Sequence, residues 1–320
     1  MEKLPLGLVM ELRNVVPYKT GSWRTLMPIN VMHTPPCNHA CPAGNDIRGF
    51  LRVLAEKKDY EQAWHMLTRT NPFPAVCGRV CPHPCEGGCN RRDFDEPLAI
   101  NCAERAVGDY GLENNLKHKK LIETRKEKVA VIGSGPAGFY CAFHLAKRGF
   151  QVKIYEANSE PGGMMRYGIP SYRQPNYVLK QEIDNILSLG VELECNVKVG
   201  VNIPFDQLRN EYDAVFLGMG AQKGVSIDIP GKDAENVFTG VEFLKQVNTG
   251  KWVEIGNDVV VIGGGNTAMD CARVAKRLGA NVNIVYRRTR NEMPAITAEI
   301  DEAMEERIMF RYHTNPTKLV

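Results

Sequence analysis

The sequence predicts an α/β protein in which a helical, cysteine-rich N-terminal domain precedes two doubly wound units of parallel strands. From Lys128 onward, short β-branched runs alternate with helical periodicity. The plan of strand, glycine turn, helix and strand occurs twice, starting at Lys128 and at Asp258. Seven of the ten cysteines lie before residue 113. The 320 residues therefore divide into predicted domains 1–112, 113–232 and 233–320.

The N-terminal domain is predicted to contain two amphipathic helices. Apolar residues recur at i, i+3, i+4 and i+7 in two stretches, Ile47 to Leu54 and Tyr60 to Leu67. Asp59 can cap the second helix, and Pro72 and Pro74 end it before the next cysteines. The helices thus space the cysteine groups along the chain.

The charged, poorly periodic residues 113–127 are typical of a surface connector. The first glycine turn follows an apolar strand and opens a helix, and it runs Gly133-Ser134-Gly135-Pro136-Ala137-Gly138. In such turns one glycine permits the bend, one lets a pyrophosphate approach and one allows close packing of helix on strand. Glu156, at the end of the next strand, can accept ribose hydroxyls. This pattern predicts dinucleotide binding. The alternative is a glycine-rich turn that serves only the packing of helix on strand.

The stretch from Pro161 to Pro170 follows Glu156 and contains the paired glycines Gly162 and Gly163. Dehydrogenases that bind only NAD do not need such a segment, and it resembles the FAD-binding pattern of flavoproteins with two dinucleotide sites. The first unit is therefore expected to bind FAD. The alternative is an irregular surface loop.

The second glycine turn reads Gly263-Gly264-Gly265-Asn266-Thr267-Ala268, with Arg287 and Arg288 where the first copy has its acid. Guanidinium groups at that position can pair with a ribose 2′-phosphate, whereas an acid would accept the 2′-hydroxyl of NAD. The second unit is therefore expected to bind NADPH. There are two alternatives: these arginines form a solvated basic edge without a ligand, or the unit uses NADH.

The N-terminal cysteines fall into groups with short spacings, namely Cys37 and Cys41, then Cys77, Cys81, Cys85 and Cys89, then Cys102. Thiolates three or four residues apart on turns can converge on one centre, and prolines after two of them interrupt the backbone as in iron–sulphur loops. The CxxC knuckles that zinc prefers are absent. Iron–sulphur binding is the favoured interpretation over zinc and over free thiols. Cys141, Cys195 and Cys271 are predicted to be small apolar residues of the later units.

Composition excludes several classes of partner. The net charge of +3 and the pI near 8.3 are too balanced to favour nucleic acid or an anionic membrane. The longest nearly apolar stretch, Val129 to Ala146, is broken by glycines, Pro136 and His144, so no membrane span is predicted. The N-terminus does not resemble a cleavable signal peptide, and the expected compartment is the cytoplasm. Clustered thiols in that compartment point to metal and not to disulfides.

The motifs CNHACP, CGRVCPHPCEGGC, GSGPAGFYCAFHLAKRG, YEANSEPGGMMRYGIPSYR, GGGNTAMDCAR and VYRRTRNEMPA together resemble the small-subunit family of glutamate synthase. The same unit resembles the N-terminal half of dihydropyrimidine dehydrogenase and the FAD subunits of anaerobic electron-transfer complexes. The resemblance runs from about Cys37 to the C-terminus. It implies that hydride passes from NADPH or NADH to FAD, and that single electrons then pass through [4Fe–4S] clusters to a larger partner subunit, or in reverse.

The resemblance also implies site residues, although it implies no proton-transfer residue. The FAD contacts it implies are Gly133, Ser134, Gly135, Pro136, Ala137, Gly138, Glu156, Gly163, Met164, Arg173 and Val199. The nicotinamide dinucleotide contacts it implies are Gly264, Gly265, Asn266, Thr267, Arg287 and Arg288.

The cluster ligands depart from the family pattern. A CxxC pair is usual just before Cys37, but the corresponding stretch, Asn30 to Pro36, has no cysteine. The resemblance implies one complete cluster, with Cys41, Cys81, Cys85 and Glu104 as its expected ligands. The other retains Cys37 and Cys89, and it is either lost or completed by Cys77 and Cys102.

In this family the nicotinamide domain is inserted into the FAD domain, and the chain then returns to finish the FAD site. The sequence ends at Val320, inside the nicotinamide domain, so part of both sites is expected to be missing.

Two other functions compete with electron transfer to a partner. A self-contained small-molecule reductase is disfavoured because no thiol pair follows the first glycine turn. A non-catalytic scaffold that holds clusters or nucleotide is the other.

Overall fold

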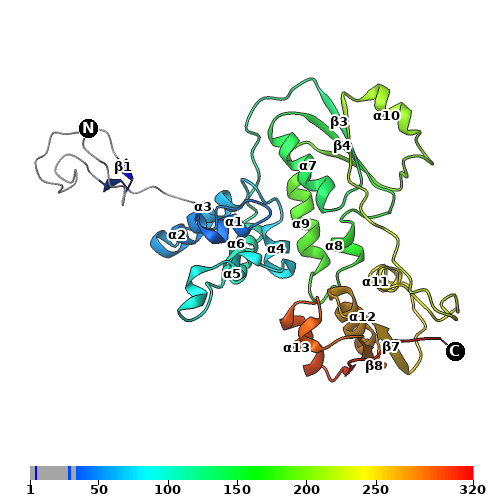
Figure 1. The fold of residues 1–320 in the computed structure, drawn as a ribbon. Coiled ribbons are helices and arrows are strands. Elements are labelled where there is room, and N and C mark those ends of the chain that lie inside the picture. The colour runs from blue at the N-terminus through cyan, green and yellow to red at the C-terminus, as the bar shows by residue number, and fades with distance from the viewer. Residues whose placement is uncertain (1–3, 6–27, 30–33, 320) are drawn as a thin grey trace, which may run out of the picture.

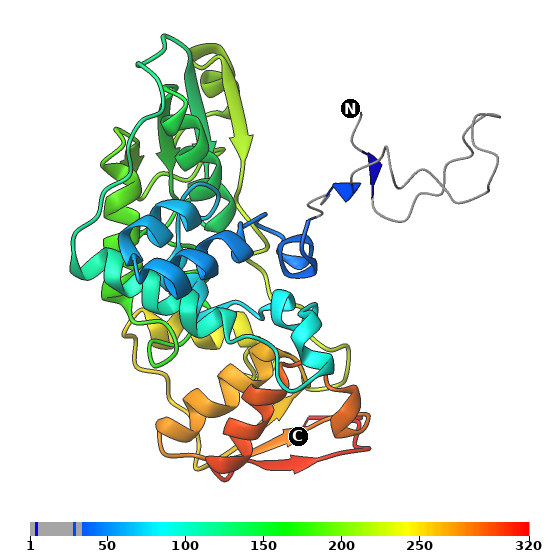
Figure 2. The same ribbon diagram turned by 90° about the vertical axis from the view of Figure 1, so that its left-hand side faces the viewer.

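The computed structural model describes residues 4–5, 28–29 and 34–319. Figures 1 and 2 show a helical N-terminal domain beside the first parallel sheet, with the second parallel sheet at the far end of the molecule. Two short strands, β1 (Leu4–Pro5) and β2 (Pro28–Ile29), pair in parallel with each other. Part of the cysteine-free stretch from Asn30 to Pro36 lies outside the described residues.

The N-terminal domain is built from short helices. They are α1 (Pro36–Ala40), α2 (Ile47–Lys57), α3 (Tyr60–Leu67), α4 (Pro74–Val80), α5 (Pro84–Gly87) and α6 (Ile100–Glu113), with a 3-10 turn at Asn90–Asp93. The two predicted amphipathic helices are confirmed as α2 and α3. Asp59 caps α3 as expected, because its Oδ1 accepts the backbone N–H of Gln62 at 2.8 Å.

The first unit has a four-stranded parallel sheet in the order β5-β4-β3-β6. Its elements are β3 (Lys128–Ile132), α7 (Pro136–Lys147), β4 (Gln151–Tyr155), α8 (Met164–Tyr167), α9 (Asn176–Leu187), β5 (Glu192–Glu194), α10 (Phe205–Glu211) and β6 (Ala214–Leu217). The order reverses between β3 and β6, the position where doubly wound sheets bind dinucleotides.

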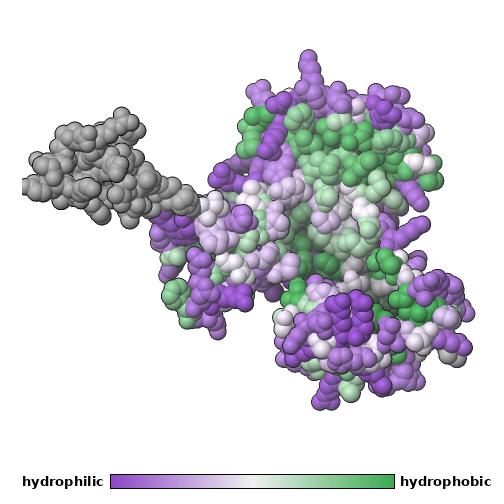
Figure 3. All heavy atoms as spheres, in the orientation of Figure 1, coloured by the Kyte–Doolittle hydropathy of each residue, from purple (hydrophilic) through white to green (hydrophobic). Residues whose placement is uncertain are grey.

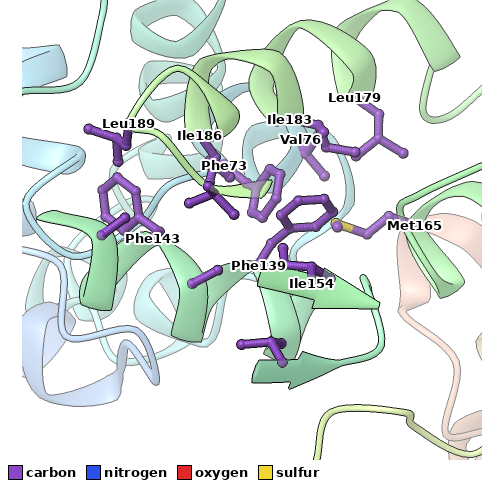
Figure 4. Close-up of a cluster of buried hydrophobic side chains, with 14 of the residues drawn as sticks. Phe73, Val76, Phe139, Phe143, Ile154, Met165, Leu179, Ile183, Ile186 and Leu189 are labelled. Atoms are coloured by element: carbon purple, nitrogen blue, oxygen red, sulfur yellow. The ribbon is translucent and has the colours of Figure 1, made fainter. Parts of the chain in front are cut away.

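The N-terminal domain and the first unit share one hydrophobic core, shown in Figure 4. Phe139 of α7 and Ile183 of α9 contribute side chains that are almost fully buried. Phe73, at the N-terminal end of α4, packs edge-on against Phe139 with ring centroids 5.9 Å apart. Val76 of α4 belongs to the same cluster. The cysteine-bearing helices therefore pack firmly against the first unit.

The second unit has a three-stranded parallel sheet in the order β7-β8-β9. Its elements are α11 (Gly240–Asn248), β7 (Asp258–Ile262), α12 (Asn266–Arg277), β8 (Asn281–Val285), a 3-10 turn at Arg290–Glu292, α13 (Thr297–Glu305) and β9 (Met309–Arg311). Both predicted copies of strand, glycine turn, helix and strand are thus confirmed.

Apolar side chains remain exposed on the sheets. Figure 3 shows apolar surface over the sheet of the first unit. On and just after β6, Phe216, Leu217 and Met219 are exposed, as is Val260 of β7. Among the helices of the described residues, we find none with the length and apolar character that a bilayer crossing requires.

Candidate dinucleotide and iron–sulphur sites

The first glycine turn has the backbone that its sequence requires. Gly133 has a φ of +100°, and a Cβ there would lie 2.5 Å from the carbonyl oxygen of Gly218. A Cβ on Gly138 would lie 1.9 Å from the carbonyl oxygen of Gly133. Glycine is therefore needed at both positions to hold β3, the turn and α7 together.

The middle glycine of that turn faces open space. The atom nearest to a Cβ built on Gly135 is the Cα of Gly163, 3.9 Å away. Gly135 is also the N-cap of α7, and no side chain caps this helix. Pro136 follows at the first helical position. The N–H groups that follow Pro136 in the first turn thus have no side-chain cap, and uncapped helix N-termini of this kind bind diphosphates.

The paired glycines lie directly against the first turn. Gly163 has a φ of +53°, and a Cβ there would lie 2.6 Å from the Cα of Gly135. The N–H of Gly162 donates to the carbonyl oxygen of Ser134 at 3.1 Å. Met164 then begins α8. The segment that the sequence associated with FAD is therefore part of the wall of this opening.

Glu156 is buried at the carboxyl end of β4 and is fixed beside the same turn. One carboxylate oxygen accepts the N–H of Ser134 at 2.9 Å and also its hydroxyl. The other accepts the backbone and side-chain N–H groups of Asn158 at 2.8 and 2.7 Å. These four hydrogen bonds occupy the acceptor sites of the carboxylate, so a ribose hydroxyl bound to Glu156 would displace one of the present donors.

Arg173 and Val199 lie in different surroundings. The Arg173 guanidinium is paired with Asp270 of α12, at 2.8 Å, and with Glu299 of α13. Its described partners therefore belong to the second unit, and it bridges the two units. Val199 lies beyond β5 and packs with Ile203 in a separate apolar cluster.

The second glycine turn repeats the plan with one difference. Gly263 has a φ of +136°, and no protein atom lies within 4 Å of a Cβ built on Gly265. Gly264 instead packs against the ring of Tyr286, where a Cβ would lie 2.6 Å from the ring. The Asn266 side chain accepts the N–H of Ile296 at 2.9 Å. The residue open to a diphosphate is thus Gly265, at the start of α12.

Thr267 faces α11, because a Cβ on Gly240 would lie 2.9 Å from its methyl group. Arg287 and Arg288 follow β8 and are exposed. Among the described residues neither makes a side-chain hydrogen bond or ion pair, whereas Arg290 pairs with Asp301. The two arginines thus follow β8 directly and have no side-chain partner among the described residues, and their contact with a ribose phosphate stays a prediction.

Four predicted cluster ligands influence one another electrostatically. Burial, together with the nearby charges of Cys41, Cys81 and Glu104, raises the pKa of the Cys85 thiol to about 12. Burial raises the pKa of the Glu104 carboxyl to about 7, against hydrogen bonds from two asparagine amides. These are Asn45 at 3.3 Å and Asn71 at 2.9 Å.

The remaining cysteines divide in a way that the sequence did not show. Burial raises the pKa of Cys37, and Cys89 adds to the rise, so these two lie near each other. Burial raises the pKa of Cys77 well above its usual range, and the charges of Glu104, Glu182 and Cys81 add to the rise. Its Sγ also donates to Oδ1 of Asn71 at 3.7 Å, and the Asn71 amide binds Glu104. Cys102 is exposed on α6. The structure thus associates Cys77 with the Glu104 group and not with Cys37 and Cys89.

Within residues 34–319 no three His, Cys, Asp or Glu side chains approach closely enough to hold a metal ion. Iron binds thiolates, so the cysteines would release their protons as a cluster forms. The donor set of three thiols and one carboxylate suits an iron–sulphur cluster. Cys271 is buried in α12 and Cys141 packs against the shared core, which matches their predicted apolar role.

Two protein-family models match the chain. Residues 127–319 match the pyridine nucleotide-disulphide oxidoreductase model. Residues 31–116 match dihydropyrimidine dehydrogenase domain II, 4Fe-4S cluster. Both match where the motifs predicted such units, with the boundary between them in the charged connector.

Curated relatives match nearly the whole chain. The NADPH-Fe(3+) oxidoreductase subunit beta of Geobacter sulfurreducens is 39% identical over 295 residues, which cover 90% of this chain and 44% of the relative. The glutamate synthase [NADPH] small chain of Escherichia coli is 34% identical, over 88% of this chain and 63% of that protein. The chain therefore spans about half the length of the curated relatives it matches.

Solved structures support the fold. The 2-naphthoyl-CoA reductase complex with 2-naphthoyl-CoA has a TM-score of 0.57 at 20% identity, over 88% of this chain and 39% of that one. Mycobacterium tuberculosis FprA in complex with NADPH has a TM-score of 0.55 at 22% identity, over 61% of both chains. With these glycine turns, this cysteine domain and these relatives, the chain belongs to the pyridine nucleotide-disulphide oxidoreductases, in the group related to the glutamate synthase small subunit, which binds FAD, NAD(P)H and [4Fe–4S].

Proposed function

We propose that this chain belongs to an electron-transfer subunit that moves electrons between NAD(P)H and a larger partner protein in the cytoplasm. The observation that carries the proposal is the shared core of the cysteine domain and the first dinucleotide unit, which fixes α4 against α7 and α9. When bound, FAD accepts a hydride from NAD(P)H and releases its two electrons singly to a [4Fe–4S] cluster. The names of the relatives support a subunit of a larger enzyme.

The chain's own residues bind and orient the nucleotides. Gly135 and the N-terminus of α7 receive the FAD diphosphate, and Glu156 receives the adenosine ribose. Gly265 and the N-terminus of α12 receive the diphosphate of the nicotinamide nucleotide. Arg173 holds the two units together through Asp270 and Glu299. Hydride transfer depends on this alignment more than on an acid or base.

Purification of the native complex without oxygen tests the function. We expect a flavin absorbance spectrum, iron and labile sulphide, and reduction of an artificial dye by NAD(P)H. Partner subunits identified by mass in the same preparation would name the terminal acceptor. A full-length, partner-bound sample without flavin would contradict the proposal.

Coenzyme choice is expected to depend on Arg287 and Arg288. Replacing both with serine should weaken NADPH binding by about 1–3 kcal/mol, because charge-assisted hydrogen bonds to the 2′-phosphate are lost. NADH binding should hardly change. The control is Arg290→Ser, which removes a guanidinium paired with Asp301 in the same loop. Titration with both coenzymes is the measurement, and equal losses for the two would show that these arginines do not read the phosphate.

One [4Fe–4S] cluster is proposed on Cys41, Cys81, Cys85 and Glu104. Cys81→Ser should remove about four iron atoms per chain together with the corresponding paramagnetic resonance signal. Cys195→Ser, at a thiol of the first dinucleotide unit that belongs to neither proposed cluster, is the control and should change neither. A second cluster would draw on Cys37 and Cys89. If the wild type holds about eight iron atoms per chain and Cys77→Ser or Cys102→Ser lowers that number, the substituted thiol completes the second cluster.

A further inference from the structure

Glu182 is a carboxylate of α9, in the first dinucleotide unit, that reaches into the cysteine domain. Its side chain is 3% exposed. One oxygen accepts the backbone N–H of Ala75 at 2.7 Å, and the other accepts that of Val76 at 3.0 Å. Both amides lie in the first turn of α4, where helix geometry leaves N–H groups without partners. The N-cap residue of α4, Phe73, supplies no side-chain bond, so Glu182 caps this helix from another domain.

The capped helix leads directly to proposed cluster ligands. Cys81 is the C-cap of α4, and its N–H donates to the carbonyl oxygen of Cys77 at 3.0 Å. A helix of this length is stiff and spans about 10 Å. A displacement at Ala75 and Val76 is therefore transmitted to Cys81.

Helix α4 is also fixed to α6, which carries Glu104. A Cβ on Gly78 would lie 2.4 Å from the Cα of Arg105, and one on Gly108 would lie 2.4 Å from the N atom of Ala75. Arg79 binds both carboxylate oxygens of Asp109, at 2.6 and 2.9 Å. The two helices thus move as one body, and whatever holds α4 also holds Glu104.

We propose that Glu182 is a positioning residue for electron transfer, since it fixes the α4–α6 pair and its cluster ligands at a set distance from the flavin unit. The proposal rests on the proposed function. Both oxygens of Glu182 bind α4, the helix that ends in a proposed cluster ligand. Apolar packing of Phe73 against Phe139 permits sliding, whereas two directed hydrogen bonds define one position.

Glu182→Gln in the full-length complex tests the proposal. Glutamine offers one acceptor oxygen, and its amide N–H₂ would face a second N–H. Exchange of the backbone amides of residues 73–80, followed by mass spectrometry, should become about tenfold faster. In stopped-flow measurements, reduction of flavin by NADPH should stay at the wild-type rate. The following step, from flavin to cluster, should slow by about tenfold, because small displacements cost large factors in rate.

Asn185→Ala is the matched control. Asn185 lies on the same helix and is 5% exposed, and its side chain also bonds backbone groups outside that helix. These bonds go to the connector that leads from the cysteine domain into the first unit: Asn185 accepts the N–H of His118 at 3.2 Å and donates to the carbonyl oxygen of Leu116 at 2.9 Å. This variant should speed exchange near residue 118 and leave both residues 73–80 and electron transfer unchanged. Glu182→Asp keeps the charge but shortens the side chain, and it serves if the glutamine variant does not fold.

Normal flavin-to-cluster transfer in a folded Glu182 variant, with or without faster exchange, would overturn the proposal. Equal slowing by Asn185→Ala would do so too, because the effect would then be general. Failure of the wild type to reduce flavin with NADPH would instead contradict the proposed function. In that case the exchange of residues 73–80 still reports whether Glu182 fixes α4.

Discussion

Gly138→Ala is expected to unfold the first dinucleotide unit, whereas Gly135→Ala is expected to fold normally and lose FAD. A methyl group on Gly138 would lie 1.9 Å from the carbonyl oxygen of Gly133, and this neighbour is backbone that cannot rotate away. Separating α7 from the turn should cost about 3 kcal/mol. A methyl group on Gly135 meets no protein atom closer than 3.9 Å. It would occupy the opening that the diphosphate needs.

Thermal unfolding and flavin content, measured on the same preparations, check this pair. We expect a lower melting temperature or aggregation for Gly138→Ala. Gly135→Ala should melt within a few degrees of the wild type without flavin, after allowance for the stabilisation that bound FAD gives. Full FAD occupancy in Gly135→Ala would show that the opening is not the diphosphate site.

Arg173→Ala is expected to destabilise the contact between the two dinucleotide units strongly. It leaves Asp270 and Glu299, both nearly buried, without their guanidinium partner. Removing one member of a buried ion pair typically costs about 3–5 kcal/mol. Tyr172, the residue before Arg173, packs under the Arg277 guanidinium of the second unit at 3.8 Å, and this contact should weaken as well. Lys180→Ala breaks an exposed pair with Asp184 in the same unit and should cost little.

The loss is expected to depend on pH. Burial raises the pKa of both Asp270 and Glu299, and Arg173 opposes the rise. Without Arg173 the folded-state pKa values rise further above those of the unfolded chain. The variant therefore gains stability as pH falls through these raised values, where the two carboxyls become neutral. Denaturant unfolding of variant and wild type at several pH values should show the largest difference at neutral pH and a smaller one in acid. A constant difference would contradict the role of these carboxyls.

Local rules explain the parts that the sequence predicted well. The need for a positive φ at Gly133 and Gly263 follows from the turn itself. The periodicity of residues 47–54 and 60–67 follows from one helix face meeting one core. The position of Arg287 and Arg288 at the end of a strand could be predicted because β8 directly precedes them in the chain. In each case the residues that decide the structure are neighbours in the chain.

Arg173 shows what such rules miss. The family resemblance associated it with FAD, which stays a prediction, and the structure adds Asp270 and Glu299 as its partners, 97 and 126 residues further along the chain. Cys77 is a second case, because spacing alone groups it with the other cysteines. In the structure it is influenced by Glu104 and Glu182. A side chain's partner across a domain boundary depends on how the domains pack, and no local pattern records that.

The sequence by itself determined the two glycine turns, the strand and helix that flank each, and the division of the cysteines into spaced groups. These depend on backbone sterics and on hydrophobic periodicity, which act over a few residues. Only the tertiary structure decided that Phe73 and Val76 complete the core of the first unit, and that Glu182 caps α4. Those contacts form because burial of apolar surface brings distant segments together, and the buried N–H groups of α4 then require an acceptor from whichever segment lies opposite.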